Sequence, residues 1–354
     1  MRMQTIGAAS AVIFLASAAH ADPLGYVSTL GGSISAIESY NSAGLVNSVA
    51  ITGNTFQVTL PGLGDGLHSN VQVSGENTNG QGHYCTVIDW FSSNGADVIV
   101  NVACFDAAGN PKLNDFTMLY QVRTTRPSGA DVAFVWADQP GAVSYTPNVN
   151  YSFNSIGGPN TITRASPGNY TVILGDFQVN DTNVQVTAYG GGAARCQIAG
   201  WMGAFTDGAH VNVLCVNAAN TPSDEFFSMT YALGGVEGSG HAVGAFAWGN
   251  RPAAKAYIPN KRFQFSNISQ AQFSNAQRFG GAVQGQYSLN IPNPGNLNFS
   301  SYLGMVTSYG SSGEYCDTGG INVFTGEIDL DIICYDSAGR QVNTRYSATM
   351  MTIP

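Results

Sequence analysis

Short runs in which apolar and polar residues alternate recur along the whole chain, separated by Gly, Asn and Pro. Alternation of this kind is typical of a β-strand with one buried and one exposed face, and the runs are rich in Val, Tyr, Phe and Thr. No segment keeps the 3.6-residue period of an amphipathic helix. The pattern therefore predicts an all-β fold. The middle third of the chain holds eight predicted strands: 132–137, 151–155, 161–165, 170–174, 184–189, 196–202, 210–217 and 226–232.

Three long repeats, each marked by a pair of cysteines, account for the chain after its first residues. Matching segments are VNVACFDAAG, VNVLCVNAAN and LDIICYDSAG, which carry the second cysteine of each pair. The two cysteines of a pair are 19, 19 and 18 positions apart in the three repeats. Internal repetition on this scale indicates a repeat architecture. We expect the repeats to span residues 22–127, 128–238 and 239–354, with all three forming one closed domain.

The cysteines and the N-terminus both point to an oxidising compartment. Residues 1–21 combine a charged start at Arg2, an apolar run over 8–19 and the sequence Ala19-His20-Ala21, which together are typical of a secretory signal peptide. We expect a secreted or periplasmic protein whose mature chain has no transmembrane segment. Zinc is disfavoured because cysteines separated by only two residues are absent. The predicted disulfides are Cys85–Cys104, Cys196–Cys215 and Cys316–Cys334.

The cysteine-bearing strands of a repeat are predicted to form a hairpin. In the first repeat Asn94-Gly95 predicts a two-residue turn, and a hairpin centred there places Cys85 directly opposite Cys104. In the second repeat the corresponding Asp207-Gly208 is off centre, so we expect a bulge or a longer loop.

Eight strands in each repeat are compatible with two architectures. Each repeat can form two four-stranded blades, which gives a six-bladed β-propeller, or one β-sandwich, which gives three tandem sandwich domains. A weak similarity between the two halves of the second repeat favours blades, so the propeller is our prediction and the sandwiches are the alternative.

Composition excludes several functional classes. The formal net charge is −9, and removal of Arg2 with the signal peptide makes it −10. An acidic chain of this kind is a poor nucleic-acid binder. Charged residues make up 10% of the sequence and hydrophobic residues 44%, so the chain can bury a core. We expect no nucleic-acid partner, no cofactor and a monomer.

An acidic strand in the third repeat is a candidate cation site. Glu327, Asp329 and Asp331 alternate along one strand and therefore share a face. Clustered carboxylates attract calcium, although a single flat strand rarely completes a calcium shell and the D-x-D-x-D-G loop is absent. The alternative is a solvated acidic edge that prevents strand pairing. The same repeat has Ile321 where the others have Trp90 and Trp201.

Two tryptophans near the starts of repeats are candidate ligand-binding residues. Trp136 with Asp138, and Trp248 with Arg251, occupy matching places in the second and third repeats. Indole rings can stack on sugars while the charged groups bind hydroxyls, and successive repeats would give multivalent binding. The alternative is that both tryptophans pack at repeat junctions, as large recurring aromatic residues do.

No familiar catalytic motif accompanies these features. The sequence lacks G-x-S-x-G, H-E-x-x-H and S-x-x-K, and no histidine recurs in all three repeats. We therefore predict a secreted, non-enzymatic lectin-like protein that binds a glycan or cell-surface ligand. One alternative is an extracellular polysaccharide hydrolase or lyase, because paired carboxylates need not be close in sequence. A second alternative is a structural envelope protein.

Overall fold

The computed structural model describes residues 22–77, 80–127, 129–238, 240–268, 275–278, 283–294 and 299–353, so the predicted signal peptide lies outside the described residues. Within these ranges the chain forms β-strands and two short 3₁₀ turns, η1 (Val149–Tyr151) and η2 (Lys261–Phe263), and no α-helix. The all-β prediction is therefore confirmed.

The strands follow the three repeats. The first repeat contains β1 (Leu24–Leu30), β2 (Ser33–Asn41), β3 (Ser48–Thr52), β4 (Thr55–Leu60), β5 (Ser69–Gly75), β6 (His83–Ser92), β7 (Val98–Asp106) and β8 (Phe116–Val122). The second contains β9 (Asp131–Ala137), β10 (Ser144–Tyr145), β11 (Ser152–Asn154), β12 (Asn160–Ser166), β13 (Asn169–Leu174), β14 (Thr182–Tyr189), β15 (Arg195–Phe205), β16 (Gly208–Val216) and β17 (Phe226–Leu233). The third contains β18 (Val243–Gly249), β19 (Ala256–Tyr257), β20 (Gln264–Ser266), β21 (Asn275–Arg278), β22 (Gln286–Asn293), β23 (Ser301–Tyr309), β24 (Tyr315–Phe324), β25 (Gly326–Tyr335) and β26 (Arg345–Ile353).

The described strands form four sheets of four, five, eight and nine strands, and the eight- and nine-stranded sheets each cross a boundary between repeats. Within each repeat, parts of two sheets pack face to face as the two layers of a sandwich. In the first repeat the strand orders are β2-β1-β8-β5 and β3-β4-β7-β6. The second repeat has β11-β9-β17-β14 and β10-β12-β13-β16-β15, and the third has β20-β18-β26-β23 and β19-β21-β22-β25-β24. A hydrophobic core drawn from both sheets fills each sandwich. The inward positions of the alternating runs supply these cores, as the pattern predicts.

The prediction of a six-bladed propeller is wrong, because strands from both halves of a repeat share a sheet. β1 pairs with β8 from Leu24–Gln121 to Ser28–Thr117, so the first and last strands of the repeat are neighbours. A propeller blade instead needs four strands of its own. The similarity between half-repeats reflects the alternation that all these strands share. Each repeat is a sandwich, as in the alternative, but the three sandwiches do not form a row of separate beads.

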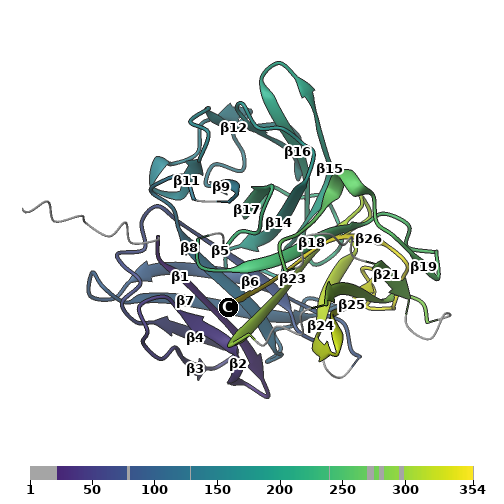
Figure 1. Ribbon diagram of the computed structural model, residues 1–354. Helices are drawn as coiled ribbons and strands as arrows, with labels where there is room; N and C mark the ends of the chain where they lie inside the picture. The colour runs from purple at the N-terminus through teal and green to yellow at the C-terminus, as the bar shows by residue number, and fades with distance from the viewer. Residues whose placement is uncertain are drawn as a thin grey trace, which may run out of the picture.

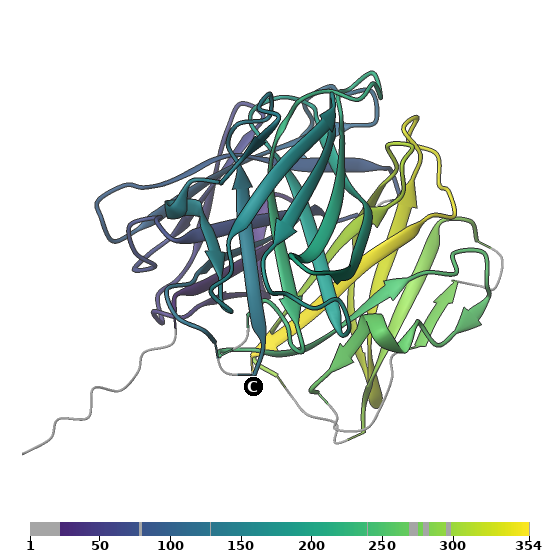
Figure 2. The same ribbon diagram turned by 90° about the horizontal axis from the view of Figure 1, so that it is seen from above.

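The three sandwiches close into a ring with approximate threefold symmetry (Figure 1). β14 pairs in parallel with β6 through Tyr189 and Val87, and β15 pairs with β23 through Ile198 and Tyr309. A parallel bridge between Glu76 and Thr318 joins the third repeat to the first. Figure 2, turned by 90°, shows the third repeat, in green to yellow, lying against the other two. We number these junctions interface 1 (repeats 1 and 2), interface 2 (repeats 2 and 3) and interface 3 (repeats 3 and 1).

Three hydroxyl groups complete the ring near its axis. One hydroxyl lies on each of β5, β14 and β23. Each hydroxyl donates to the backbone carbonyl of one residue in the neighbouring repeat and accepts a hydrogen bond from the backbone N–H of that same neighbouring residue. The donations run from Ser74 to Val306 at 3.0 Å, from Thr187 to Val73 at 3.1 Å and from Thr307 to Val186 at 3.4 Å. The returning N–H···O distances are 3.0, 2.9 and 3.0 Å. Buried backbone groups beyond the sheet ladders are thereby satisfied.

All three predicted disulfides are present, and the cysteines of each pair lie opposite each other in a hairpin. The Cα atoms are 4.0, 4.1 and 4.0 Å apart in the first, second and third repeats. The bulge expected in the second repeat follows Ile198. The two-residue turn predicted at Asn94-Gly95 is wrong, since a bulge after Val87 is followed by a longer loop between Ser92 and Val98. The longer loop is centred on Gly95, and the extra residue of the bulge shifts the register by one, so Cys85 still lies opposite Cys104.

Candidate functional site

The same four positions form the contact at every interface between repeats. One is the residue five places after the first cysteine of a repeat, which lies on β6, β15 or β24. The other three come from the next repeat around the ring. One lies on its first strand, one lies just before β11 or β20 or near the end of β2, and one takes part in the parallel bridge. Comparison of these four positions shows where the ring departs from its symmetry.

At interface 1 all four positions are aromatic. Trp90 and Trp136 have ring centroids 6.2 Å apart, and both rings contact Tyr151 and Tyr189. The Trp90–Tyr189 and Trp136–Tyr151 pairs are edge-to-face at 5.4 and 5.3 Å. This geometry adds stability beyond the burial of apolar area. Interface 1 is therefore sealed by an aromatic cluster.

Interface 2 repeats this arrangement. Trp201 and Trp248 are 5.6 Å apart, and Phe263 and Tyr309 complete the cluster. The Trp201–Tyr309 and Trp248–Phe263 centroid distances are 5.3 and 5.2 Å. Two of the three interfaces are thus filled by the same kind of four-ring aromatic cluster, which we call the aromatic plug.

Interface 3 replaces the plug with polar and aliphatic side chains. Ser28 pairs with Thr117 in the strand register, just as Trp136 pairs with Ser228 in the second repeat. Ser28 therefore occupies the position that Trp136 has at interface 1. Strand register places Glu38 where the second repeat has Tyr151, because the following Ser39 pairs with Val27 as Ser152 pairs with Val135. Glu76 takes the place of Tyr189 in the parallel bridge, and Ile321 is the residue five places after its cysteine. The four side chains at interface 3 are Ser28, Glu38, Glu76 and Ile321, and all four line one cavity of about 10 Å³.

Glu76 is the most strongly perturbed acid of this interface. It is 5% exposed, and its carboxyl accepts a hydrogen bond from the Ser28 hydroxyl. Burial raises the pKa of Glu76 to about 8, the Ser28 hydrogen bond opposes this rise, and the charges of Glu38 and Asp115 add to it. A carboxyl group with this pKa is mostly protonated at neutral pH, so it can donate a proton or a hydrogen bond.

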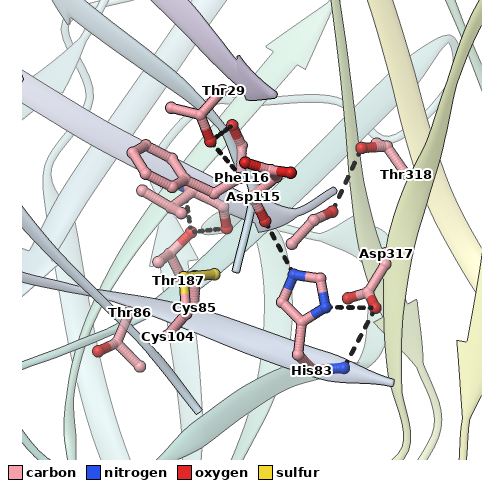
Figure 3. The surroundings of a disulfide bond; sticks show 12 residues. Thr29, His83, Cys85, Thr86, Cys104, Asp115, Phe116, Thr187, Asp317 and Thr318 are labelled. Atoms are coloured by element: carbon pink, nitrogen blue, oxygen red, sulfur yellow. Dashed lines mark hydrogen bonds and ion pairs between the residues drawn. A yellow bond between two sulfur atoms is a disulfide. The ribbon is translucent and has the colours of Figure 1, made fainter. Parts of the chain in front are cut away.

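A buried histidine–aspartate pair, His83 and Asp317, lies at the same interface (Figure 3). His83 Nε2 donates to the Asp115 carbonyl at 2.8 Å, and Nδ1 faces the Asp317 carboxylate of the third repeat at 3.7 Å. Burial raises the pKa of Asp317 to about 6, which the charge of His83 and hydrogen bonds from its backbone and from Asn77 counteract. Gly75 lies between them: a Cβ there would be 2.5 Å from Asp317 Oδ1 and 3.1 Å from His83 Nε2. Glycine at this position therefore allows the two side chains to approach.

Glu76 and His83 both line a larger pocket of about 250 Å³. The exposed side chains of Ile51 and Leu113 lie at this pocket. The backbone N–H groups of Gly31 and Gly32 donate to the Asp115 carboxylate at 2.9 and 3.0 Å, which fixes the wall of the pocket. The remaining lining residues are Phe56 and Asn114. The pocket combines a few polar groups with apolar surface, as small-ligand sites commonly do.

The tryptophans predicted as ligand-binding residues lie in the aromatic clusters. Trp136 contacts four other aromatic rings, and the indole nitrogens of Trp136 and Trp248 are buried. Asp138 directly follows β9, and burial raises its pKa. The Arg251 guanidinium is 5.6 Å from the Tyr257 ring centroid, on the exposed surface. This placement favours the packing interpretation and leaves ligand binding by these four residues a prediction.

The acidic residues of the third repeat alternate along β25 as predicted. Glu327 is exposed, whereas Asp329 and Asp331 are half-buried and accept hydrogen bonds from Asn290 and Asn322. Burial raises the pKa of Asp331 to about 6. β25 lies between β22 and β24, so it is not an edge strand. No group of three or more His, Cys, Asp or Glu side chains suited to a metal is found in the described part of the chain, and a calcium site here stays a prediction.

Sequence reasoning missed Ser28, Glu38 and Glu76, although part of the signal was visible. Ile321 stands out because the other repeats have tryptophan at its place. The partners of that position lie at the opposite end of the chain, in the first repeat. Only the closure of the ring shows that all four substitutions meet at one interface.

Comparisons with known proteins give no relative: no protein-family model matches the chain, and no curated protein matches its sequence. Among the described residues, no helix has the length and apolar character needed to cross a membrane. The three disulfides are consistent with an oxidising compartment.

Proposed function

We propose that the protein is a secreted or periplasmic glycan-binding protein whose ligand site is the 250 Å³ pocket of the first repeat, which reaches interface 3 at Glu76. The observation that carries this proposal is the loss of the aromatic plug at one of three otherwise equivalent interfaces. Replacing packed rings by Ser28, Glu38 and Glu76 sacrifices stabilising contacts. A ligand site at interface 3 would explain why polar side chains replace the aromatic rings there and not at the other two interfaces.

The chemistry of the pocket suits a sugar. Sugar hydroxyls both donate and accept hydrogen bonds, and the carboxyl group of Glu76 offers both functions when protonated. Ile51 and Leu113 provide apolar surface for the C–H faces of a sugar ring. The pocket is open enough for a small ligand group without rearrangement of the sheets.

A glycan array with the mature, disulfide-intact protein tests the proposal. We expect the wild type to bind at least one glycan, and Glu76→Tyr, which introduces the tyrosine of the equivalent positions, to block that binding. Leu113→Ala alters only the exposed wall of the pocket and should weaken binding without affecting folding. Tyr189→Phe is the matched control, because it changes the equivalent position at interface 1. Absence of glycan binding by the wild type, or full binding by both pocket variants, would contradict the proposal.

A second candidate function is hydrolysis of a polysaccharide. It is favoured by the pKa of Glu76 at about 8, since a general acid must be protonated at the working pH, and by the second carboxyl of Glu38, which lines the 10 Å³ cavity together with Glu76. A reducing-end assay run alongside the array distinguishes the two functions. An enzyme releases reducing ends and loses this activity in Glu76→Gln while it still binds the glycan. A binding protein releases none.

A further inference from the structure

The residue before the first cysteine of each repeat lies at the axis of the ring. These residues are Tyr84, Arg195 and Tyr315, so the ring of three is asymmetric here too. The guanidinium carbon of Arg195 is 4.9 Å from the Tyr84 ring centroid and 5.6 Å from that of Tyr315. The two tyrosine rings contact each other edge-to-face at 5.4 Å. The three side chains therefore form one cluster, in which both phenol rings hold the cation.

Arg195 is deeply buried without a neutralising partner. It is 4% exposed, and its Nη2 donates to the Asn220 side-chain oxygen at 3.2 Å. The Tyr84 hydroxyl interacts with the guanidinium and donates its own proton to the Ala193 carbonyl. Nε and Nη1 make no hydrogen bond of normal geometry within the described part of the chain, and Arg195 takes part in none of the ion pairs found there. Arginine keeps its charge in proteins, so burial cannot be relieved by loss of a proton. Two buried, unpaired donors on a cation are costly unless an acceptor reaches them.

A cavity of about 50 Å³ adjoins this cluster. Its lining comes from all three repeats and includes Arg195, Tyr84 and Tyr315. Such a volume is sufficient for ordered water or one small ion. The Tyr315 hydroxyl is buried without a hydrogen-bond partner in the described structure, so it is a further available donor.

Two acidic side chains also line the cavity, but both are engaged elsewhere. The Glu314 carboxylate accepts hydrogen bonds from the Ser312 N–H at 3.1 Å and from Gln197 at 3.5 Å. Asp317 faces His83 across interface 3. Neither carboxylate therefore satisfies the Nε and Nη1 donors of Arg195.

An open hollow of about 750 Å³ lies at the same end of the axis. Its rim is formed by three equivalent turns, residues 106–109, 217–220 and 336–339, which meet around the axis. A Cβ at Gly109 would be 2.6 Å from the Ala218 side chain, and one at Gly339 would be 2.6 Å from that of Ala107. Asn220 belongs to this rim and also binds Arg195, so the cation lies directly behind the hollow.

We propose that Arg195 binds a small oxyanion group, a carboxylate, phosphate or sulfate, in the cavity on the ring axis. Nε and Nη1 of the guanidinium donate to two oxygens of the anion, which is the bidentate geometry that arginine favours. The Tyr315 hydroxyl supplies a third hydrogen bond. The two tyrosine rings hold the guanidinium in place. This site is separate from the 250 Å³ pocket of the first repeat, and the proposal does not depend on the glycan-binding function.

Calorimetric titration of the mature, disulfide-intact protein tests this site with three probes: sodium sulfate, sodium phosphate and sodium glucuronate, at constant ionic strength. Binding of sulfate or phosphate identifies a site for free inorganic anions, whereas preference for glucuronate identifies a carboxylate-bearing sugar as the source. In Arg195→Gln we expect the dissociation constant to rise at least about tenfold, since charged hydrogen bonds are lost. Arg126→Gln, which removes an exposed arginine paired with Asp131, is the matched control and should bind as the wild type does.

A further variant guards against a folding defect in Arg195→Gln. Arg195→Tyr introduces the residue that the other two repeats carry at this position, and it should also abolish binding. Circular dichroism and the melting temperature without anion confirm that each variant is folded. Absence of binding by all three probes, or unchanged binding in both Arg195 variants, would overturn the proposal and leave water as the only occupant of the cavity.

Discussion

At the scale of single residues, burial controls the protonation of Glu76 at interface 3. An aromatic ring at this place, as at the other two interfaces, has no charge to desolvate. Glu76 instead has to remain neutral to stay buried. Its hydrogen bond with Ser28 only partly offsets the free-energy cost of burying an ionised carboxylate. The symmetry of the ring is thus broken by a residue whose stability contribution depends on pH.

Stability should fall with rising pH because of this residue. The pKa of Glu76 rises from 4.5 to about 8 on folding, so the folded state binds its proton more tightly than the unfolded state does. Its contribution is complete below about pH 4.5 and is lost as the pH rises to about 8. We expect the free energy of unfolding of the wild type to decrease over this window, relative to Glu76→Gln, by on the order of a few kcal/mol. Denaturant unfolding of both proteins at pH 5 and pH 9 measures the difference.

The comparison with Glu76→Gln isolates Glu76 from other buried acids. Glu237 and Asp317 also have raised pKa values, about 7 and about 6, and contribute equally to both proteins. A difference between wild type and variant that does not change with pH would show that Glu76 is ionised in the folded protein.

Trp136 tests whether the aromatic clusters are packing or binding elements. Truncation to alanine removes a ring that contacts four others, so Trp136→Ala should cost roughly 3–5 kcal/mol. Arg251→Ala, at an exposed side chain, should change stability by less than about 0.5 kcal/mol. Thermal unfolding measures both. A Trp136→Ala protein with wild-type stability and lost glycan binding would instead support the ligand-binding interpretation.

At the scale of strands, β5, β14 and β23 hold the repeats together through hydroxyl groups rather than a continuous ladder. Each parallel contact between repeats pairs few residues, so the hydroxyls of Ser74, Thr187 and Thr307 satisfy backbone groups that the ladders leave unpaired. The first repeat has Ser74 where the other two have Thr187 and Thr307. Both residue types fit this role, since a hydroxyl group can donate one hydrogen bond and accept another.

Removal of one hydroxyl should therefore weaken the ring. Thr187→Val keeps the shape of the side chain but leaves the Val73 N–H without its acceptor, which should cost about 1–3 kcal/mol. Thr163→Val is the control, because Thr163 is half-buried on β12 and makes only a long hydrogen bond of 3.4 Å within its own sheet. Chemical denaturation of both variants gives the comparison, and equal costs would argue against a special role for the axial hydroxyls.

At the scale of the whole molecule, closure of the ring gives the chain the dimensions of a single domain. A compact chain of the mature length has a radius of gyration of about 20 Å. We expect small-angle scattering of the secreted protein to give a value near this one. A markedly larger radius would show that the sandwiches are arranged as an extended row in solution.

The sequence by itself determined the local features of this protein. Alternation with period two specifies strands because side chains of an extended chain point to opposite faces. The pairing of Cys85 with Cys104, and of its two counterparts, followed from their even spacing within repeats. These features depend on residues close together in the chain, so they are accessible to pattern reasoning.

The tertiary structure alone decided the architecture and both proposed sites. β1 and β8 are separated by nearly a whole repeat, and nothing in their alternation specifies which strand either will join. Glu76 and Ile321 meet only because the third sandwich returns to the first, and Arg195 reaches Tyr315 only at the axis that this closure creates. Contacts of this kind depend on how large surfaces pack against one another, and residues far apart in sequence carry no local pattern that records them.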